Sequence, residues 1–481
     1  MGPERQSAGC DMGVGHGLVA GRARVVALPH RLSPGEAFEA FCPLPYAFFL
    51  DSALAGPRLG RFSFLGAEPR AVLSAKGRTL RWREEGVERS EEGNPFTALR
   101  ELIGRCRVES ADHPVPFVGG LVGYLGYDLC HFVERLPRTA TDDIALPDLH
   151  FALYDGVAAY DHEACQWYAA STAGEGPIAR IDALLASARP DTRFAELPAS
   201  TSPICSNFAR DRYLEAVRQA KDYIAAGDIF QVNLSQRFDT TIAVPPAELY
   251  RRLRSANPAP FAAYLALDGD DGAVLSSSPE RFLKVADRYV ETRPIKGTRP
   301  RGRTPQEDGR LAAQLLSSSK DSAELTMIVD LERNDLGRVC DYGSVVVTEH
   351  KTLEAYASVF HLVSTVVGRL HEGQDLVDLL KATFPGGSIT GAPKVRSMEI
   401  IDELEPTQRS VYTGSIGYIG ADGTMDLNIV IRTILVHGNR VFFQVGGGIV
   451  ADSDPDAEYQ ETLDKGARLF RALGHEADMP L

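Results

Sequence analysis

The segment that most constrains the fold runs from Met425 to Val450, MDLNIVIRTILVHGNRVFFQVGGGIV. It contains two runs rich in β-branched and aromatic residues, separated by His437-Gly438-Asn439. This pattern predicts two strands joined by a turn. The segment that follows, DPDAEYQETLDKGARLFRAL, carries Pro455 and Asp456 at its start and predicts a helix. Strands followed by a helix favour an α/β or α+β fold.

Strand-like and helix-like segments are unevenly distributed along the rest of the chain. Short strand-like runs dominate roughly the first 190 residues, and a Pro/Ser/Thr-rich stretch at 189–207 follows them. Beyond it, residues 210–227 and 319–338 are helix-like, whereas residues 229–238 are strand-like. We therefore divide the chain into a polar, Gly-rich leader at 1–20 that we expect to be disordered, an N-terminal region at 21–190 and a C-terminal region at 207–475.

Composition argues against several classes of function. The net charge of −14 over 481 residues disfavours a general nucleic-acid binder and a protein that binds an anionic membrane. No apolar run approaches the ~20 residues that a membrane-spanning helix needs. The seven cysteines form no CxxC pair, so we expect no structural disulfide or zinc site, mostly buried thiols and a cytoplasmic location.

Lys296, within RPIKGTRPRG, is the first candidate for chemistry. A lysine becomes nucleophilic when neighbouring cations or desolvation lower the pKa of its ammonium group. A solvated basic loop explains the same local pattern, and the stretch by itself favours that explanation. The cations nearby in sequence are Arg293, Arg299, Arg301 and Arg303.

Arg432 and the glycine run at 446–448 are candidates for binding an anion. Arg432 lies in a β-branched, strand-like run, where a buried guanidinium needs an anion from a ligand or from the protein, such as Asp426. Glycines allow close backbone approach and leave N–H groups that can point at an anion. A salt bridge for the arginine and a tight bulge for the glycines are the alternatives that the sequence leaves open.

Carboxylates at three positions suggest a cation site. Glu458 and Glu461 are three residues apart and share one helix face, and Glu324 lies in a largely apolar helical segment. Carboxylates from two helices suit Mg²⁺, which prefers oxygen ligands, although glutamates on helix surfaces are common. His361, in SVFHLVS, is either an acid/base group or a core histidine, with the core position favoured. Together these candidates suit a small dianionic substrate.

Seven motifs in order make the chain resemble the chorismate-utilising enzymes. They cover roughly residues 211–473, and YAFFLDS, GRFSFLGAEP and GGLVGYLGYD extend the resemblance into the N-terminal half. The resemblance implies two stacked antiparallel β-sheets flanked by helices, with both halves of the chain interleaved. The seven motifs are GDIFQVNLSQRF, SSSPERF, PIKGTRPRG, AELTMIVDLERNDLGRV, FPGGSITGAPKVRSMEII, YTGSIGYIG and EYQETLDKGARL.

Within this family, the chain resembles the ammonia-using branch that makes 4-amino-4-deoxychorismate on the route to 4-aminobenzoate and folate. The resemblance implies that Lys296 attacks C2 of chorismate as the C4 hydroxyl leaves, after which ammonia attacks C4 and expels the lysine. Glu280 matches the general acid/base, and we group His361 with these two as catalytic. Gln231 stands where family members that add water carry a lysine.

The resemblance also implies a Mg²⁺ site and a substrate pocket. Glu324 and Glu461 match the metal ligands, with Glu458 and Asp321 as supporting carboxylates. Mg²⁺ and the N–H groups of the glycine run would hold the ring carboxylate, whereas the enolpyruvyl carboxylate would be bound by an arginine and a tyrosine. The matching substrate positions are Gly297, Thr298, Ser388, Tyr412, Arg432, Gly446, Gly447, Gly448 and Lys465.

A tryptophan pocket is implied in the N-terminal half. In anthranilate synthases this pocket is the feedback site, and in the ammonia-using branch it can hold tryptophan structurally. The LDS sequence ending at Ser52 departs from the LES of feedback-inhibited relatives, which leaves regulation open. The matching positions are Ser52, Leu59, Gly60, Arg61, Phe62, Pro260, Phe261 and Ala262.

Partners follow from the same resemblance. The sequence shows no glutaminase-like cysteine site, so we expect ammonia from a separate glutamine amidotransferase subunit or from free ammonium. A separate aminodeoxychorismate lyase is expected to act on the product. An anthranilate synthase with an atypical lysine is the main alternative, and a catalytically idle subunit that only holds chorismate or tryptophan is another.

Overall fold

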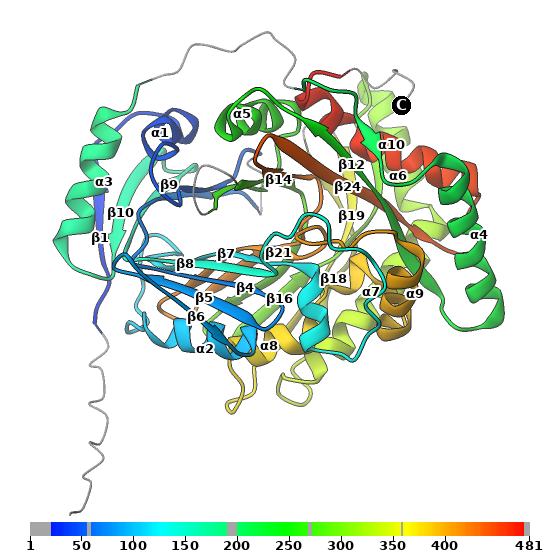
Figure 1. Cartoon of the computed structure of the whole chain (residues 1–481), viewed down its shortest axis with the longest axis horizontal. Helices are drawn as coiled ribbons and strands as arrows, with labels where there is room; N and C mark the ends of the chain where they lie inside the picture. Colours follow the sequence, from blue (N-terminus) through cyan, green and yellow to red (C-terminus); the bar gives the residue numbers. More distant parts are fainter. Residues whose placement is uncertain (1–20, 55–58, 190–199, 268–271, 357–358, 476–481) are drawn as a thin grey trace, which may run out of the picture.

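The computed structural model describes residues 21–54, 59–189, 200–267, 272–356 and 359–475, so the leader expected at 1–20 lies outside the described residues. Two twelve-stranded sheets of antiparallel strands form the body of the protein, and helices cover their outer faces (Figure 1). The expected class, two stacked antiparallel sheets flanked by helices, is confirmed.

The first sheet carries one wall of the site described below. In spatial order it consists of β1 (Arg24–Leu28), β10 (Gln166–Ser171), β9 (Gly156–Asp161), β3 (Phe62–Gly66), β2 (Phe48–Asp51), β13 (Phe261–Ala266), β14 (Gly272–Ser278), β23 (Thr433–His437), β24 (Arg440–Ile449), β12 (Gln231–Thr241) and β11 (Cys205–Ser206), with β20 (Gly391–Ala392) paired to β12.

The second sheet carries the opposite wall. Its order is β17 (Ile295–Pro300), β19 (Val359–Arg369), β16 (Tyr289–Arg293), β15 (Arg281–Ala286), β22 (Met425–Asn428), β21 (Ser415–Gly420), β7 (Gly120–Leu125), β8 (Leu149–Tyr154), β4 (Ala71–Lys76), β5 (Thr79–Glu84) and β6 (Val87–Glu92), with β18 (Val346–Ala355) paired to β19.

The helices bury apolar side chains against the outer sides of the sheets. Against the first sheet pack α1 (Pro34–Phe41), α3 (Glu175–Ser187), α4 (Arg210–Ala226), α5 (Pro246–Ala256), α9 (Lys394–Leu404) and α10 (Pro455–Ala472). Against the second sheet pack α2 (Pro95–Gly104), α6 (Pro305–Leu316), α7 (Ser319–Gly337) and α8 (Leu376–Thr383). The 3₁₀ turns η1 (Tyr127–Phe132) and η3 (Gly387–Ile389) lie in connections.

An aromatic layer fills the space between the sheets. Phe64 of β3 meets Tyr418 of β21 with ring centroids 5.7 Å apart, and Phe117 stacks on Tyr418 at 4.4 Å. Both sheets combine strands from the two halves of the chain, since β2 pairs with β13 and β7 pairs with β21. The connection near residue 200 therefore joins two halves that share both sheets.

The segment 425–436, which the sequence predicted as one strand, is divided between the two sheets. Its first part is β22 in the second sheet, and its last part is β23 in the first sheet. Arg432 lies at the crossing with φ of 54°, in the left-handed region. The prediction of a continuous strand was wrong because alternating apolar residues do not reveal that the chain changes sheets.

Other local predictions are confirmed. The helix at 210–226 ends at Gly227, which has φ of 84° and caps the last turn. The helices at 319–337 and 455–472 and the strand at 231–241 also form. Among the described helices, none is long and apolar enough to cross a membrane.

The cysteine prediction holds only in part. Cys106, Cys130 and Cys340 are buried, but Cys165 and Cys205 are exposed. The two exposed thiols lie in a turn after β9 and in the short edge strand β11, where little chain is available to cover them. Burial of a thiol depends on such tertiary placement, which the spacing of cysteines does not reveal.

Candidate active site

A cavity of about 790 Å³ opens between the ends of the two sheets. Lys296, Glu280 and His361 all line it, and so do Glu324 and Glu461. The predicted substrate positions at 297, 298, 388, 412, 432, 446–448 and 465 line the same cavity. Of the candidates for this site, only Glu458 stands outside the lining, behind Gly447.

A β-bulge places Lys296 in the cavity. β17 pairs with β19, and the register shifts between Lys296 and Thr298 because Gly297 adopts a φ of 77°. A Cβ at position 297 would lie 2.8–2.9 Å from Leu315 and Asp321, so the site needs glycine for space as well as for conformation. The Nζ atom of Lys296 donates a hydrogen bond of 3.0 Å to the carbonyl oxygen of Ser388.

Burial lowers the pKa of the Lys296 ammonium group. The positive charge of Lys465, from α10, lowers this pKa further, whereas the carboxylates of Glu324, Glu280 and Glu461 act in the opposite direction. A lowered pKa increases the fraction of neutral amine, which is the nucleophilic form.

Three of the four arginines close to Lys296 in sequence are engaged by carboxylates. Arg299 pairs with Asp321 at 3.0 Å, Arg301 pairs with Asp308 at 2.7 Å, and Arg293 pairs with Glu354. The local pattern favoured a solvated basic loop, but Lys296 lines the cavity, and the flanking arginines are not the cations that lower its pKa. Desolvation and a cation from a distant helix have this effect instead.

Glu280 is a buried carboxyl group beside the lysine. Its Oε1 accepts a long hydrogen bond of 3.4 Å from the Ile295 N–H. Burial raises its pKa, although the Ser388 side chain and the charge of Lys296 oppose that effect. A carboxyl group that holds its proton at higher pH can protonate a leaving hydroxyl.

His361 is buried, as the favoured core interpretation expected, but its side chain also lines the cavity. It is a buried residue of β19, and its Nδ1 forms a 2.9 Å hydrogen bond with Thr298 Oγ1. Burial and the nearby charge of Arg432 lower its pKa to about 4. The ring is therefore neutral near pH 7 and lines the cavity as an uncharged hydrogen-bonding group.

Arg432 has no carboxylate partner within the described ranges. The predicted alternative partner, Asp426, is bound to Arg281 at 2.9–3.0 Å. Burial and the neighbouring Arg468 lower the pKa of Arg432, and Tyr412 lies close enough to act in the opposite direction. A buried guanidinium without a counter-ion, beside a second arginine, forms a site for an anionic ligand.

The glycine run lies on the cavity side of β24. β12 pairs along one edge of these residues, whereas β23 pairs with β24 only at Arg440–Phe443. Beyond Phe443 the other edge has no strand partner among the described strands, so N–H groups on that edge are available to a ligand.

Two carboxylates of α10 lie against Gly447, and a third lines the cavity from α7. A Cβ at position 447 would lie 3.2 Å from Glu461 Oε1 and 3.3 Å from Glu458 Oε2. Glu458 Oε2 is buried without a hydrogen-bond partner in the described part of the protein, whereas its Oε1 accepts from Ser453 at 2.6 Å. Glu324 lies across the cavity on α7.

The charges of these carboxylates depend on their neighbours. Burial raises the pKa of Glu324 and of Glu458. Burial also raises the pKa of Glu461, but Lys465, at 2.7 Å, together with Lys320 and Lys296 outweighs it, and the net shift is downward. The described residues contain no ready-made group of three or more metal-ligating side chains. Mg²⁺ usually takes one or two protein carboxylates plus waters and substrate oxygens, so this oxygen-only set fits that ion.

The implied tryptophan-pocket positions lie close together where β2, β3 and β13 meet. Ser52 Oγ donates to the Phe62 carbonyl at 2.6 Å, and Ala262 pairs with Asp51. Leu59 is buried, and Arg61 is bound by Asp161 at 2.8 Å. These contacts bring together three segments, around residues 52, 60 and 261, that are far apart in sequence. Gly60, Pro260 and Phe261 belong to the second and third of these segments.

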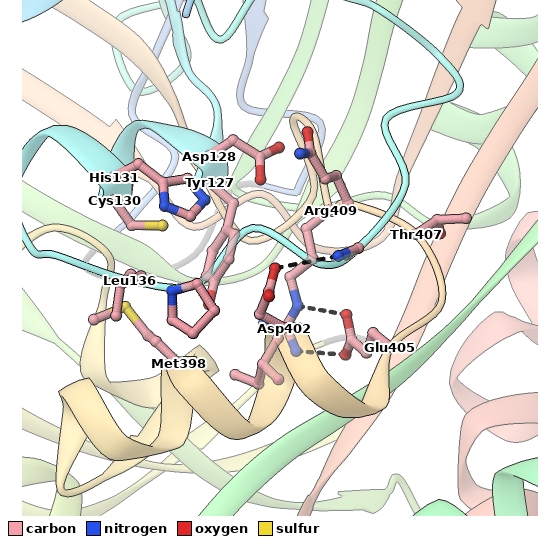
Figure 2. A pocket seen from close by; sticks show the side chains of 14 residues that line it. Tyr127, Asp128, Cys130, His131, Leu136, Met398, Asp402, Glu405, Thr407 and Arg409 are labelled. Atoms are coloured by element: carbon pink, nitrogen blue, oxygen red, sulfur yellow. Dashed lines mark hydrogen bonds and ion pairs between the residues drawn. The ribbon is translucent and has the colours of Figure 1, made fainter.

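Three polar residues of the site had no clear signal in the sequence, and Gln231 was noted there only by family resemblance. Asn233, Arg409 and Arg468 all line the cavity. Gln231, next to the lining, is fully buried with both amide atoms unpartnered among the described residues, and its Nε2 lies 2.2 Å from where a Gly448 Cβ would be. Arg409 also lines a small second cavity, where it forms an ion pair with Glu405 (Figure 2).

The chain is similar in sequence and in structure to enzymes that use chorismate or are named for its products. The model of the chorismate binding enzyme family matches residues 46–471. The chain is 42% identical to aminodeoxychorismate synthase component 1 of Klebsiella aerogenes, over 93% of this chain and 98% of that protein. It is 43% identical to anthranilate synthase component 1 of Cereibacter sphaeroides, over 88% of both chains. Anthranilate synthase component I from Streptococcus pneumoniae matches with a TM-score of 0.76 and 34% identity, over 86% of this chain and 93% of that one.

Proposed function

The chain belongs to the chorismate binding enzymes, and from this membership we propose that it is an aminodeoxychorismate synthase component that converts chorismate and ammonia to 4-amino-4-deoxychorismate. The observation that carries the proposal is Lys296. Its amine is held by a neutral carbonyl in the cavity, where burial lowers its pKa. That setting suits a nucleophile better than a structural cation, which would be paired with a carboxylate.

In the first step the neutral amine of Lys296 bonds to C2 of chorismate. The two ring double bonds shift, the C4–O bond breaks, and the hydroxyl leaves as water with a proton from Glu280. The new ammonium group on the lysine then loses a proton. The raised pKa of Glu280 supports its role as the acid.

In the second step ammonia bonds to C4, the double bonds shift back, and the C2–N bond breaks as the lysine nitrogen takes up a proton, while the new ammonium group at C4 gives one up. The amino group replaces the hydroxyl on the same carbon, so the net reaction consumes one chorismate and one ammonia and releases one water. Covalent catalysis divides one difficult substitution into two easier ones.

The substrate carboxylates would be bound at opposite ends of the cavity. Arg432 and Tyr412 would bind the enolpyruvyl carboxylate, and the glycine run would bind the ring carboxylate with its unpaired N–H groups. Glu324 and Glu461 would hold Mg²⁺, with Glu458 in support. When bound, Mg²⁺ would neutralise the ring carboxylate.

The word "component" in the names of the relatives suggests a partner subunit. We propose a glutamine amidotransferase that supplies ammonia, a separate aminodeoxychorismate lyase that consumes the product, and action in the cytoplasm. Tryptophan is the proposed occupant of the site around Ser52 and Phe62.

Anthranilate synthesis is the second candidate, because anthranilate synthase relatives match at the same identity. Incubation with chorismate, Mg²⁺ and ammonium, with and without an added lyase, separates the two functions. We expect 4-aminobenzoate only when the lyase is present. Anthranilate formed without the lyase would contradict the proposal.

A further inference from the structure

The carbonyl that holds Lys296 accepts two side-chain hydrogen bonds. Lys296 Nζ donates to Ser388 O at 3.0 Å, and Asn233 Nδ2 donates to the same oxygen at 2.8 Å. A carbonyl oxygen has two lone pairs, so these donors use its full capacity. Lys296 and Asn233 therefore both constrain the orientation of the Ser388 peptide.

Asn233 is itself held firmly on β12. Its backbone N–H donates to Thr390 O at 2.8 Å, and its carbonyl accepts from Arg409 at 2.8 Å. Arg409 also donates to Ile389 O at 3.1 Å. Asn233 and Arg409 thus donate to all three successive carbonyls at 388, 389 and 390, and Lys296 is a second donor to the first of them.

Arg409 is anchored from behind by a buried ion pair. Glu405 accepts from it at 2.7 Å and 2.9 Å, and both side chains are almost inaccessible to solvent. Figure 2 shows this pair with the Tyr127 ring alongside, whose centroid lies 4.9 Å from the guanidinium carbon. Glu405 also accepts from the Ser235 N–H at 2.9 Å, which ties the pair to β12. Arg409 and Glu405 are thus held by several hydrogen bonds each, which limits the movement of the 388–390 turn.

The Ser388 carbonyl competes with carboxylates for the amine. Glu280, Glu324 and Glu461 face Lys296 from three different elements, and Lys465 is the opposing cation. A carboxylate would draw the lysine toward it and favour the protonated form. A neutral carbonyl in a fixed position engages one N–H and leaves the lone pair of a neutral amine to point into the cavity.

We propose that Asn233 is a positioning residue for Lys296, acting through the shared Ser388 carbonyl. The inference rests on the proposed function, because it assumes that Lys296 is the nucleophile. Asn233 would set how fast the covalent bond forms rather than how tightly chorismate binds.

Two variants of the same shape test this role. Asn233→Leu removes the donor without adding charge, and Asn233→Asp replaces the donor with an acceptor. The matched control is Asn207→Leu, since Asn207 is also half-buried and donates to Thr407 at 2.8 Å, but lies outside the cavity lining. Each protein is mixed with saturating chorismate and Mg²⁺ without ammonia, and the rate of adduct formation on Lys296 is followed by mass spectrometry.

We expect both Asn233 variants to form the adduct about tenfold to 100-fold more slowly, with the chorismate Kd changed less than about threefold. The control should match the wild type. An unchanged adduct rate, or a loss of affinity as large as the loss of rate, would overturn the positioning role. If Asn233→Leu does not fold, the result with Asn233→Asp decides. A wild-type protein that turns over chorismate without any adduct would overturn the proposed function itself, and the inference with it.

Discussion

The ammonium group of Lys465 lies 2.7 Å from Glu461 Oε1 and 3.0 Å from the carbonyl oxygen of Gly446. A cation thus already neutralises a carboxylate that we propose as a Mg²⁺ ligand. Lys465 and Glu461 are one helical turn apart on α10, so this pairing forms within a single helix.

Replacing Glu461 should weaken the response to Mg²⁺. Glu461→Gln removes the charged ligand but keeps the shape, and we expect the Mg²⁺ concentration for half-maximal activity to rise by about tenfold or more. Asp456→Asn, at the exposed start of the same helix, is the matched control and should leave the metal titration unchanged. A Glu461→Gln titration identical to that of the wild type would remove this residue from the metal site.

Arg432 should matter for binding and not for stability. It is a buried cation without a carboxylate partner in the described residues, so Arg432→Met should lower the affinity for chorismate by about 100-fold or more. The thermal midpoint should stay constant or rise, because an uncompensated buried charge is lost. A Tm that falls steeply while affinity is retained would indicate an ion pair instead of a ligand site.

Asp128 gives a pH dependence of stability that is separate from catalysis. Burial raises its pKa to about 7, and its carboxylate accepts from the Ser410 N–H at 2.9 Å. Because the folded pKa lies above the unfolded value of 3.8, the stability contribution is complete below about pH 4 and is lost as the pH rises through 7.

Asp128→Asn should therefore stabilise the protein at pH 8, by up to about 4 kcal/mol, and have little effect at pH 4. Asparagine can still accept the backbone hydrogen bond through its side-chain oxygen. Urea unfolding of both proteins at the two pH values measures the difference. Equal stabilities of the two proteins at pH 8 would show that the carboxylate is not penalised by burial.

Local elements of this fold were predictable because their signals are local. The helix at 210–226 has apolar residues at helical spacing and a glycine at its end, and it forms as expected. The site residues that carry obvious chemistry, such as Lys296 and Glu461, were also found. Their convergence on one cavity was implied by family resemblance, since no spacing rule connects β17 with α10.

Other features depend on tertiary contacts. Arg432 lies where the chain crosses between sheets, and nothing in its apolar neighbours marks that crossing. The basic run around Lys296 favoured a solvated loop, but carboxylates elsewhere in the fold bind three of its arginines. Asn233 and Arg409 form a buried polar network whose members look ordinary in sequence. Such a network can be recognised only from a three-dimensional structure, in which the partner of each donor and acceptor is known.

The most direct test of the account is intact-protein mass spectrometry after chorismate and Mg²⁺ are added without ammonia, followed by peptide mapping. We predict a chorismate-derived adduct on Lys296 whose rate of formation is greatest below the ordinary lysine pKa of 10.5, because the pKa of this amine is lowered, and falls at higher pH as Glu280 loses its proton. Lys296→Ala should show no adduct, whereas Lys381→Ala, on the surface of α8, should behave as the wild type. No adduct on wild-type Lys296, with anthranilate produced once ammonium is supplied, would contradict the account.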